Sequence, residues 1–446
     1  MNLKQQITSE QNNLELAVAK ALEIAKQAGA SDAEVAISRQ TGLSVSTRMG
    51  EVENVEFNHD GALGICVYRG QRRGNASTSD LSDAAIQRTV AAALDIALYT
   101  AEDEFSGLAD RELMAFDPED LDLCHPIKIE PEFAIKQASL TERLALDADP
   151  RIVNSEGAFT SHYGVKVYGN SHGLINGYAS TRHSMSAVLI ADQDGLMERD
   201  YGYSMVRDSS QLWTPEHVAQ EAVKRTVEKL GARKIDTCNV PVIFHHDVAS
   251  SLMGQLVMGI SGGSLYRKSS FLLDKLGEQI FPDWLNIQER PHIKGGLASA
   301  AYDAEGVKTK DLNVIEQGML KSYLLTSYSG RKLGMQTTGH AGGIHNWNVT
   351  GKGETLAQLC RQMGTGLLVT ELMGQGVNIV TGDYSRGASG FWVENGEIQY
   401  PVHEITIAGN LADMFKNMVA VGSDIDERSS ILMGSTLLES MQIAGN

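Results

Sequence analysis

The chain has 446 residues, more than one ordinary hydrophobic core organises, so we expect two or three domains. Hydrophobic and charged fractions of 42% and 21% are ordinary for a soluble globular protein, so we read the chain as one. A net charge of −18 would repel nucleic acid and anionic membranes, so we expect neither as a partner. The first ten residues are polar and no run of about 18 apolar residues occurs, so we expect a cytoplasmic location. The cysteines lack CxxC spacing, which predicts neither a disulfide framework nor a zinc ribbon.

The first hundred residues combine helices with antiparallel strands. Apolar residues between positions 14 and 25 recur at helical spacing, which predicts a first amphipathic helix. Over residues 33–78 the hydrophobic period changes to two, which predicts successive strands with His59-Asp60-Gly61 as a turn between two of them. A second helix is expected over residues 81–100. We place both helices on one face of the sheet.

The middle of the chain begins with an acidic, aperiodic stretch over residues 102–122. We interpret it as a solvated linker rather than a cation-binding loop, because it lacks a Gly-centred calcium loop of alternating carboxylates. A helix over residues 131–147, strands separated by Gly-rich turns, and a helix opened by Thr214 and Pro215 follow.

These patterns divide the chain near residues 233–239. We expect an N-terminal α+β subdomain over residues 1–101 and a central α+β subdomain over 123–232 that completes the N-terminal domain. A β-rich C-terminal domain is expected over residues 239–446. The predicted class is therefore α+β, with an N-terminal antiparallel sheet carrying helices on one face.

The C-terminal half is organised around residues 382–410. Two short aromatic and β-branched runs flank Asn395-Gly396, which predicts a hairpin, because a type I′ turn needs positive φ at both central residues. After Pro401, residues 402–407 are expected to form a third strand. The pattern indicates a β-meander rather than a nucleotide-binding α/β unit.

The sequence contains none of several common catalytic motifs in complete form. No phosphate-binding loop, dinucleotide fingerprint or nucleophile elbow is complete, and His403-Glu404 lacks the second histidine of a zinc helix. His340 and His345 lie in a Gly-rich loop, where they could bind a metal or peptide backbone, or hydrogen-bond loop carbonyls. Asp383 and Arg386 are either substrate contacts or an ion pair in a turn.

Several blocks together resemble the TldD/PmbA peptidase family: residues 262–269 (GGSLYRKS), 338–343 (TGHAGG), 371–376 (ELMGQG) and 382–410. The resemblance covers essentially the whole chain. It implies an α+β N-terminal domain followed by a β-barrel-like C-terminal domain. It also implies a cytoplasmic zinc protease complex in which two related subunits pair to process unfolded or ribosomally made peptides.

One departure from the family pattern bears on catalysis. The resemblance implies that a TldD-type subunit carries His-Glu-x-x-x-His on the helix after the first C-terminal strand, with a late Cys as a further zinc ligand. The corresponding positions here are Gly254, Gln255 and Gly259, with Val421 at the Cys position. Gly and Val cannot ligate zinc, and Gln cannot take a proton from water.

The leading hypothesis is therefore a non-catalytic subunit, without catalytic residues, zinc or any other cofactor of its own. Its partner would be a TldD-type catalytic subunit that holds the zinc, in a heterodimer, with a homodimer when this chain is alone and unfolded peptides as substrates. His340, His345, Asp383 and Arg386 are the candidate substrate-binding residues. Two alternatives remain open. One is an autonomous metallopeptidase with His340, His345 and Asp383 as ligands, and the other is a non-proteolytic peptide-binding or regulatory protein.

Overall fold

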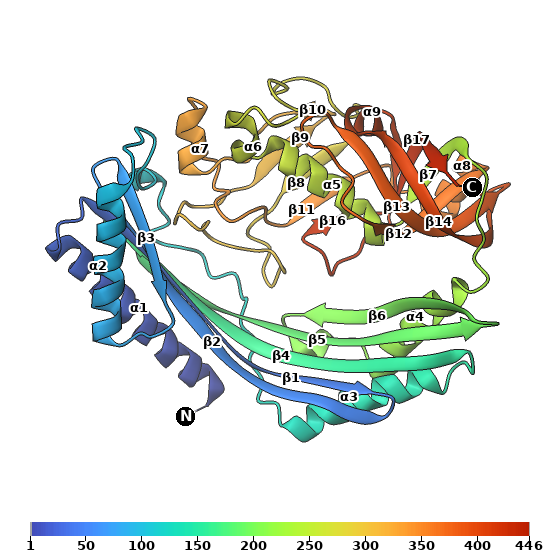
Figure 1. Ribbon diagram of the computed structural model, residues 1–446, viewed down its shortest axis with the longest axis horizontal. Helices are drawn as coiled ribbons and strands as arrows, with labels where there is room; N and C mark the ends of the chain where they lie inside the picture. The colour runs from blue at the N-terminus through green and yellow to red at the C-terminus, as the bar shows by residue number, and fades with distance from the viewer. Residues whose placement is uncertain (1, 446) are drawn as a thin grey trace.

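The computed structural model describes residues 2–445, and its N-terminal half is one antiparallel sheet of six strands (Figure 1). The strands run in the order β3-β2-β1-β4-β5-β6. Because β1 pairs with β2 on one side and β4 on the other, the first and central segments share this sheet. Its strands and helices are β1 (Asp32–Arg48), β2 (Glu51–Arg69), β3 (Arg72–Thr78), β4 (Ile152–Asn170), β5 (Ile175–Gln193), β6 (Leu196–Val206), α1 (Leu3–Gln27), α2 (Asp83–Tyr99), α3 (Pro131–Leu146) and α4 (Pro215–Glu228).

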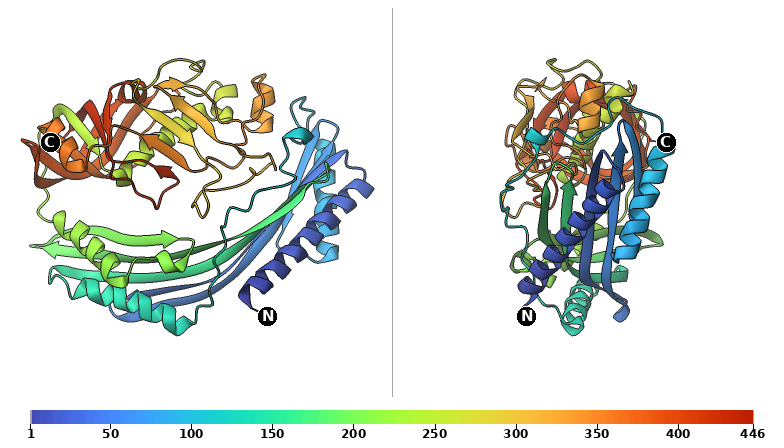
Figure 2. Two further views of the ribbon diagram at one scale, coloured as in Figure 1. Left: turned by 180° about the vertical axis from the view of Figure 1, so that it is seen from behind. Right: turned by 90° about the vertical axis from the view of Figure 1, so that its left-hand side faces the viewer.

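Four helices cover one face of this sheet, which confirms the placement expected for the first two and adds α3 and α4 to the same face. Successive side chains of a strand point to opposite faces, so odd-numbered residues of β1 such as Val35 and Val45 share the face that is buried. Val35 belongs to a core cluster with α1 and α2, and Val45 to one with α3 and α4. The other face is concave, and the C-terminal domain lies above it (Figures 1 and 2).

The predicted turn at His59-Asp60-Gly61 is wrong. These residues pair with Thr41, Gln40 and Arg39 in the middle of β2. The chain reverses instead at Met49-Gly50, where both residues have positive φ. The sequence His59-Asp60-Gly61 is typical of a turn, but continuous pairing of β1 with its two neighbouring strands keeps these residues extended. Two of the strands expected between the helix over 131–147 and Thr214, at residues 158–160 and 165–168, likewise form one strand, β4.

The segment between α2 and α3 is irregular, as expected, but it is not a solvated linker. It contains one short 3-10 turn (Arg111–Leu113), and Leu108, Met114 and Leu121 are buried. Arg331 of the C-terminal domain donates hydrogen bonds to the carbonyl oxygens of Phe105 and Gly107. Met114 packs with Tyr302 and Val307 of the C-terminal domain, so the segment holds the two domains together.

The C-terminal domain contains two sheets, in the orders β10-β9-β8-β11-β16 and β14-β13-β12-β7-β17-β15. Its elements are β7 (Cys238–Phe244), α5 (His246–Ile260), α6 (Gly262–Tyr266), β8 (Asn286–Glu289), β9 (Leu312–Glu316), β10 (Met319–Leu320), α7 (Ser327–Lys332), β11 (Trp347–Thr350), α8 (Leu356–Met363), β12 (Gly366–Met373), β13 (Asp383–Glu394), β14 (Glu397–Asn410), α9 (Leu411–Lys416), β15 (Met418–Val421), β16 (Ile431–Leu432) and β17 (Thr436–Ala444).

The second sheet closes into a five-stranded barrel, because β14 also pairs with β17. This confirms the barrel-like C-terminal domain. One cluster of buried side chains joins α5 to both sheets, with Leu252 and Leu256 of the helix fully buried. Helix α5 therefore lies in the main core of this domain.

The predicted hairpin is present: β13 and β14 pair antiparallel, and Asn395 and Gly396 have φ of 53° and 78°. The separate third strand over residues 402–407 is wrong, because β14 continues through Pro401 as one strand. The meander of β12, β13 and β14 is also joined by β7, which runs parallel to β12.

Charged side chains join the two domains at the α4 end. Lys229 contacts both Asp200 and Glu371 at 2.8 Å, and Arg428 donates to the carbonyl oxygen of Tyr203 at 2.7 Å. Within residues 2–445, no helix has both the length and the apolar character needed to cross a membrane.

Candidate functional site

A cleft of about 990 Å³ separates the concave face of the N-terminal sheet from two loops of the C-terminal domain. The loops are residues 297–304 and 341–345. On the sheet, the floor is formed by small and polar residues that point away from the helices, such as Ser38 and Gln40 of β1. The alternation that buries Val35 and Ile37 on the convex face thus leaves a polar, accessible surface on the other face.

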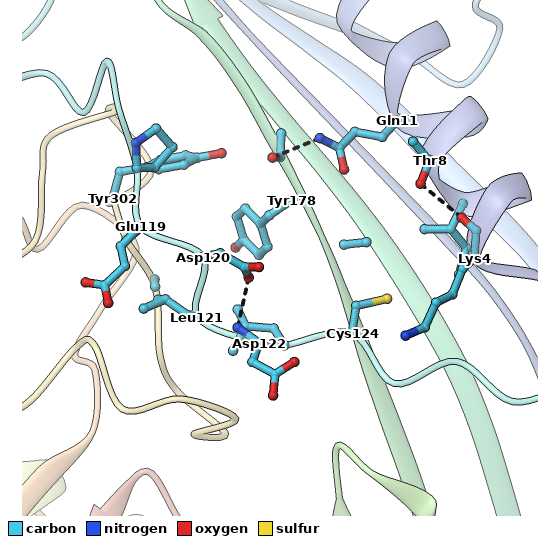
Figure 3. A pocket seen from close by; sticks show the side chains of 17 residues that line it. Lys4, Thr8, Gln11, Glu119, Asp120, Leu121, Asp122, Cys124, Tyr178 and Tyr302 are labelled. Atoms are coloured by element: carbon cyan, nitrogen blue, oxygen red, sulfur yellow. Dashed lines mark hydrogen bonds between the residues drawn. The ribbon is translucent and has the colours of Figure 1, made fainter.

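A smaller hollow of about 460 Å³ lies where residues 118–124 cross the end of the sheet beside α1 (Figure 3). Gln11 donates a hydrogen bond to the carbonyl oxygen of Gly177 there, at 3.0 Å. The smaller hollow shares Tyr178 and Tyr302 with the larger cleft. Because it borders none of the predicted site residues, we take the larger cleft as the candidate site.

His340 and His345 converge on a buried carboxylate, Glu289 of β8. His345 Nδ1 lies 2.5 Å and His340 Nε2 3.0 Å from the same oxygen, Oε1. The other carboxylate oxygen accepts a hydrogen bond from Trp347 Nε1 at 2.6 Å. His345 also lines the cleft, so this cluster forms part of the wall that the C-terminal domain contributes. The histidines therefore bind a carboxylate rather than loop carbonyls.

The electrostatics of this wall follow from burial. Burial would raise the pKa of Glu289, but hydrogen bonding and the charges of His340 and His345 outweigh it and lower the pKa to about 2. The neighbouring carboxyl of Asp303 accepts bonds from the backbone N–H groups of Ala341 and Val307. Burial nevertheless raises the pKa of Asp303 to about 6.

The structure does not bring Asp383 and Arg386 to this cleft. They lie on β13, outside the set of residues that line it. Asp383 accepts a hydrogen bond from Thr381 Oγ1 at 2.6 Å, and Arg386 Nε is buried without a hydrogen-bond partner among residues 2–445. Within the same residues the two side chains form no ion pair with each other. The carboxylate beside the histidines is Glu289, not Asp383.

The α5 positions at which the resemblance implies zinc ligands in a TldD-type subunit offer none here. The helix is regular from His246 to Ile260. A Cβ atom built on Gly254 would meet nothing within 4 Å, and Val421 is fully buried in the apolar core. The side chains at Gly254, Gln255, Gly259 and Val421 do not fit a zinc ion.

A second cluster of possible ligands is saturated by ion pairs. His245 and Asp247 are 3.0 Å apart, and the same Asp247 oxygen contacts Arg225 at 2.8 Å. Burial works against the charge on His246, but Asp247 and Asp424 raise the pKa of His246 to about 9. Each acceptor is occupied, so the cluster joins α5 to its neighbours rather than offering an open site.

Glu289 was missed by sequence reasoning. It lies 51 residues before His340, in a strand of four residues, and only its pairing with Trp347 on β11 brings it to the loop. A carboxylate in an otherwise ordinary strand pattern carries no local sign of this role.

Three family models match consecutive parts of the chain. They are PmbA/TldA metallopeptidase domain 1 over residues 33–97, the central domain over 124–230 and the C-terminal domain over 237–445. The chain is also 59% identical to the metalloprotease PmbA of Escherichia coli O157:H7, over 100% of this chain and 99% of that protein. The chain therefore belongs to the PmbA/TldD metallopeptidase family.

Solved structures have the same fold. A proposed modulator of DNA gyrase from Bacteroides thetaiotaomicron matches with a TM-score of 0.92 and 26% identity, over 96% of this chain and 98% of that one. TldE from Thermococcus kodakarensis matches with a TM-score of 0.82 and 19% identity, over 96% and 100%. At this identity the second likeness supports the fold alone.

Proposed function

We propose that this chain is a non-catalytic subunit of a cytoplasmic protease complex, and that it forms one wall of a peptide-binding cavity for a TldD-type zinc subunit. The observation that carries the proposal is the lack of ligands at the motif positions: Gly254, Gln255 and Gly259 lie on a regular helix, and Val421 is apolar and buried. A metallopeptidase needs side chains that fix the metal and a base that activates water. These positions supply neither.

The cleft supports the substrate class. Its floor is an open, polar strand surface, and its volume of about 990 Å³ suits a few residues of extended chain rather than a folded domain. An unfolded peptide can satisfy its backbone groups against the polar side chains of this sheet face. The role of this chain would be to hold such a peptide, with hydrolysis at the zinc of the partner.

One observation favours a second candidate, an autonomous metallopeptidase. Glu289, His340 and His345 place one ligand atom each within 4.8 Å of one another, a combination of two histidines and a carboxylate. Against it stand the direct contacts among these groups and the hydrogen bond of Trp347 to Glu289. A metal would have to displace the imidazole–carboxylate contacts.

The test compares the purified chain, a TldD-type subunit and their mixture. We expect this chain alone to hold much less than one zinc per chain and to cleave no unfolded peptide. Cleavage should occur when the partner is added. The mixture after zinc removal by a chelator is the matched control. About one zinc per chain, lost in His340→Ala, together with cleavage by this chain alone would instead establish the autonomous peptidase. No cleavage in any mixture would favour the binding-only alternative.

A further inference from the structure

Arg182 is a cation without a counter-ion in the candidate cleft. It lies on β5 opposite His162 of β4, on the concave face of the sheet, and is half-buried. Among residues 2–445 its side chain has no hydrogen-bond or ion-pair partner. A half-buried guanidinium without a counter-ion from the protein leaves its donors available to a ligand in the cleft.

A second arginine lies beside it. Arg207 is only 9% exposed and donates to the carbonyl oxygens of Gly296 at 3.0 Å, Leu297 at 2.8 Å and Thr181 at 3.3 Å. None of these acceptors carries a charge. A guanidinium has five N–H groups, so two remain unused.

The positive charge of Arg182 affects the pKa values of the groups around it. Burial and, next, the charge of Arg182 lower the pKa of Arg207 to about 10. Burial and Arg182 also lower the pKa of His162. A carboxylate between the two guanidinium groups would relieve this repulsion.

The acidic groups that line the cleft do not neutralise the pair. Asp60 lies opposite Gln40 on β2, at another level of the sheet, and forms no ion pair among residues 2–445. The carboxylate of Asp303 accepts hydrogen bonds from the backbone N–H groups of Glu305, Val307 and Ala341. The positive charge of the two arginines is therefore open toward the cleft.

We propose that Arg182, supported by the charge of the fixed Arg207, binds a carboxylate of the peptide that occupies the cleft. The inference rests on the proposed function, in which the cleft receives an extended peptide. An arginine binds a carboxylate through two parallel hydrogen bonds, and these bonds are strongest where water is partly excluded. Arg207 is held by both domains, so it supplies a charge of fixed position while Arg182 supplies free donors. The carboxylate is that of an acidic side chain or of the peptide C-terminus.

The test measures binding of rhodamine-labelled unstructured peptides by fluorescence anisotropy. The protein is the full chain, alone and with a TldD-type subunit whose zinc has been removed so that no cleavage occurs. Three peptides share one neutral sequence: one has an amidated C-terminus, one a free C-terminus, and one an amidated C-terminus with a central Glu. The variants are Arg182→Gln, Arg182→Lys and the control Arg88→Gln, which removes an equal charge from the exposed face of α2.

We expect at least one of the two carboxylate peptides to bind about tenfold more tightly than the neutral amidated peptide, for the wild type and Arg88→Gln. The peptide that shows the preference identifies the source of the carboxylate. Arg182→Gln should abolish the preference, and Arg182→Lys should keep part of it, because a lysine retains the charge without the paired donors. If Arg182→Gln does not fold, Arg182→Lys must still reduce the preference.

The outcomes separate this inference from the proposed function. A wild type without carboxylate preference, or a preference unchanged in both Arg182 variants, overturns the inference and leaves the peptide-binding role intact. An Arg182-dependent preference without partner-dependent cleavage supports the inference and contradicts the proposed function. Absence of binding by all three peptides, with and without the partner, contradicts both.

Discussion

Glu289 is the buried charge on which the cleft wall depends. Its side chain is 1% exposed and contacts His340, His345 and Trp347. Because its pKa is about 2 in the folded chain and about 4.5 when unfolded, the ionised form is favoured by folding. The resulting stabilisation is present above pH 4.5 and is lost as the pH falls toward 2.

We predict that Glu289→Gln lowers the free energy of unfolding by about 2–3 kcal/mol at pH 7. The difference from the wild type should shrink between pH 4.5 and pH 3, as the wild-type carboxylate loses its advantage. Urea unfolding at a series of pH values measures both quantities. Glu397→Gln, at an exposed position of the hairpin, is the control and should be neutral throughout. A Glu289→Gln penalty that is constant down to pH 3 would mean that packing, not charge, is lost.

At the scale of elements, α5 is a regular helix at the positions where the resemblance implies zinc ligands in a TldD-type subunit. A glycine in a helix interior is less favourable than alanine by roughly 0.5–1 kcal/mol. Gly254 has open space beside its α-carbon, whereas a Cβ on Gly259 would lie 3.0 Å from Leu272 Cδ1 and 3.3 Å from Phe271 Cε1. The two glycines therefore differ in their surroundings although they are equivalent in the motif.

We predict that Gly254→Ala raises the free energy of unfolding by about 0.5–1 kcal/mol. Gly259→Ala should be close to neutral, because Leu272 and Phe271 must shift by a few tenths of an ångström and the strain offsets the helix gain. Urea denaturation of the two variants beside the wild type measures the contrast. A loss of more than about 1 kcal/mol for Gly254→Ala would show that the backbone there needs glycine.

The elements that sequence reasoning found are those with a local cause. Asn395-Gly396 fixes its hairpin, and Thr214 caps α4 through a hydrogen bond to the backbone N–H of His217. The turn predicted at His59-Asp60-Gly61 is wrong because these residues pair with β1 and continue β2 as a strand. In the candidate site, the Gly-rich loop drew attention to the histidines. The sequence could not predict that Arg182 lacks an ion-pair partner, because this depends on which residues the fold places near it.

At the scale of the whole molecule, β14 offers a surface for assembly. Its residues 406–408 pair with β17, and Arg233 hydrogen-bonds the backbone of Pro401 and His403, but residues 397–400 pair only with β13. Ile398 lies in this segment, which is paired on one side only, and is 50% exposed. An unpaired strand edge beside an exposed apolar side chain favours association with another chain. A net charge of −18 on each copy opposes it, least at high salt.

We therefore predict that the chain alone forms a homodimer through the C-terminal domain, and that a TldD-type subunit competes for the same surface. Sedimentation at micromolar concentration should show the dimer, with a dissociation constant that falls as salt is raised because screening removes the repulsion.

Ile398→Lys should weaken the dimer by about tenfold or more, since a charge would be buried in the interface. Leu196→Lys, at a similarly exposed apolar position on the N-terminal sheet, is the matched control and should leave the dimer unchanged. A wild-type monomer at all salt concentrations would refute the homodimer. Weakening by Leu196→Lys instead of Ile398→Lys would place the contact on the N-terminal domain.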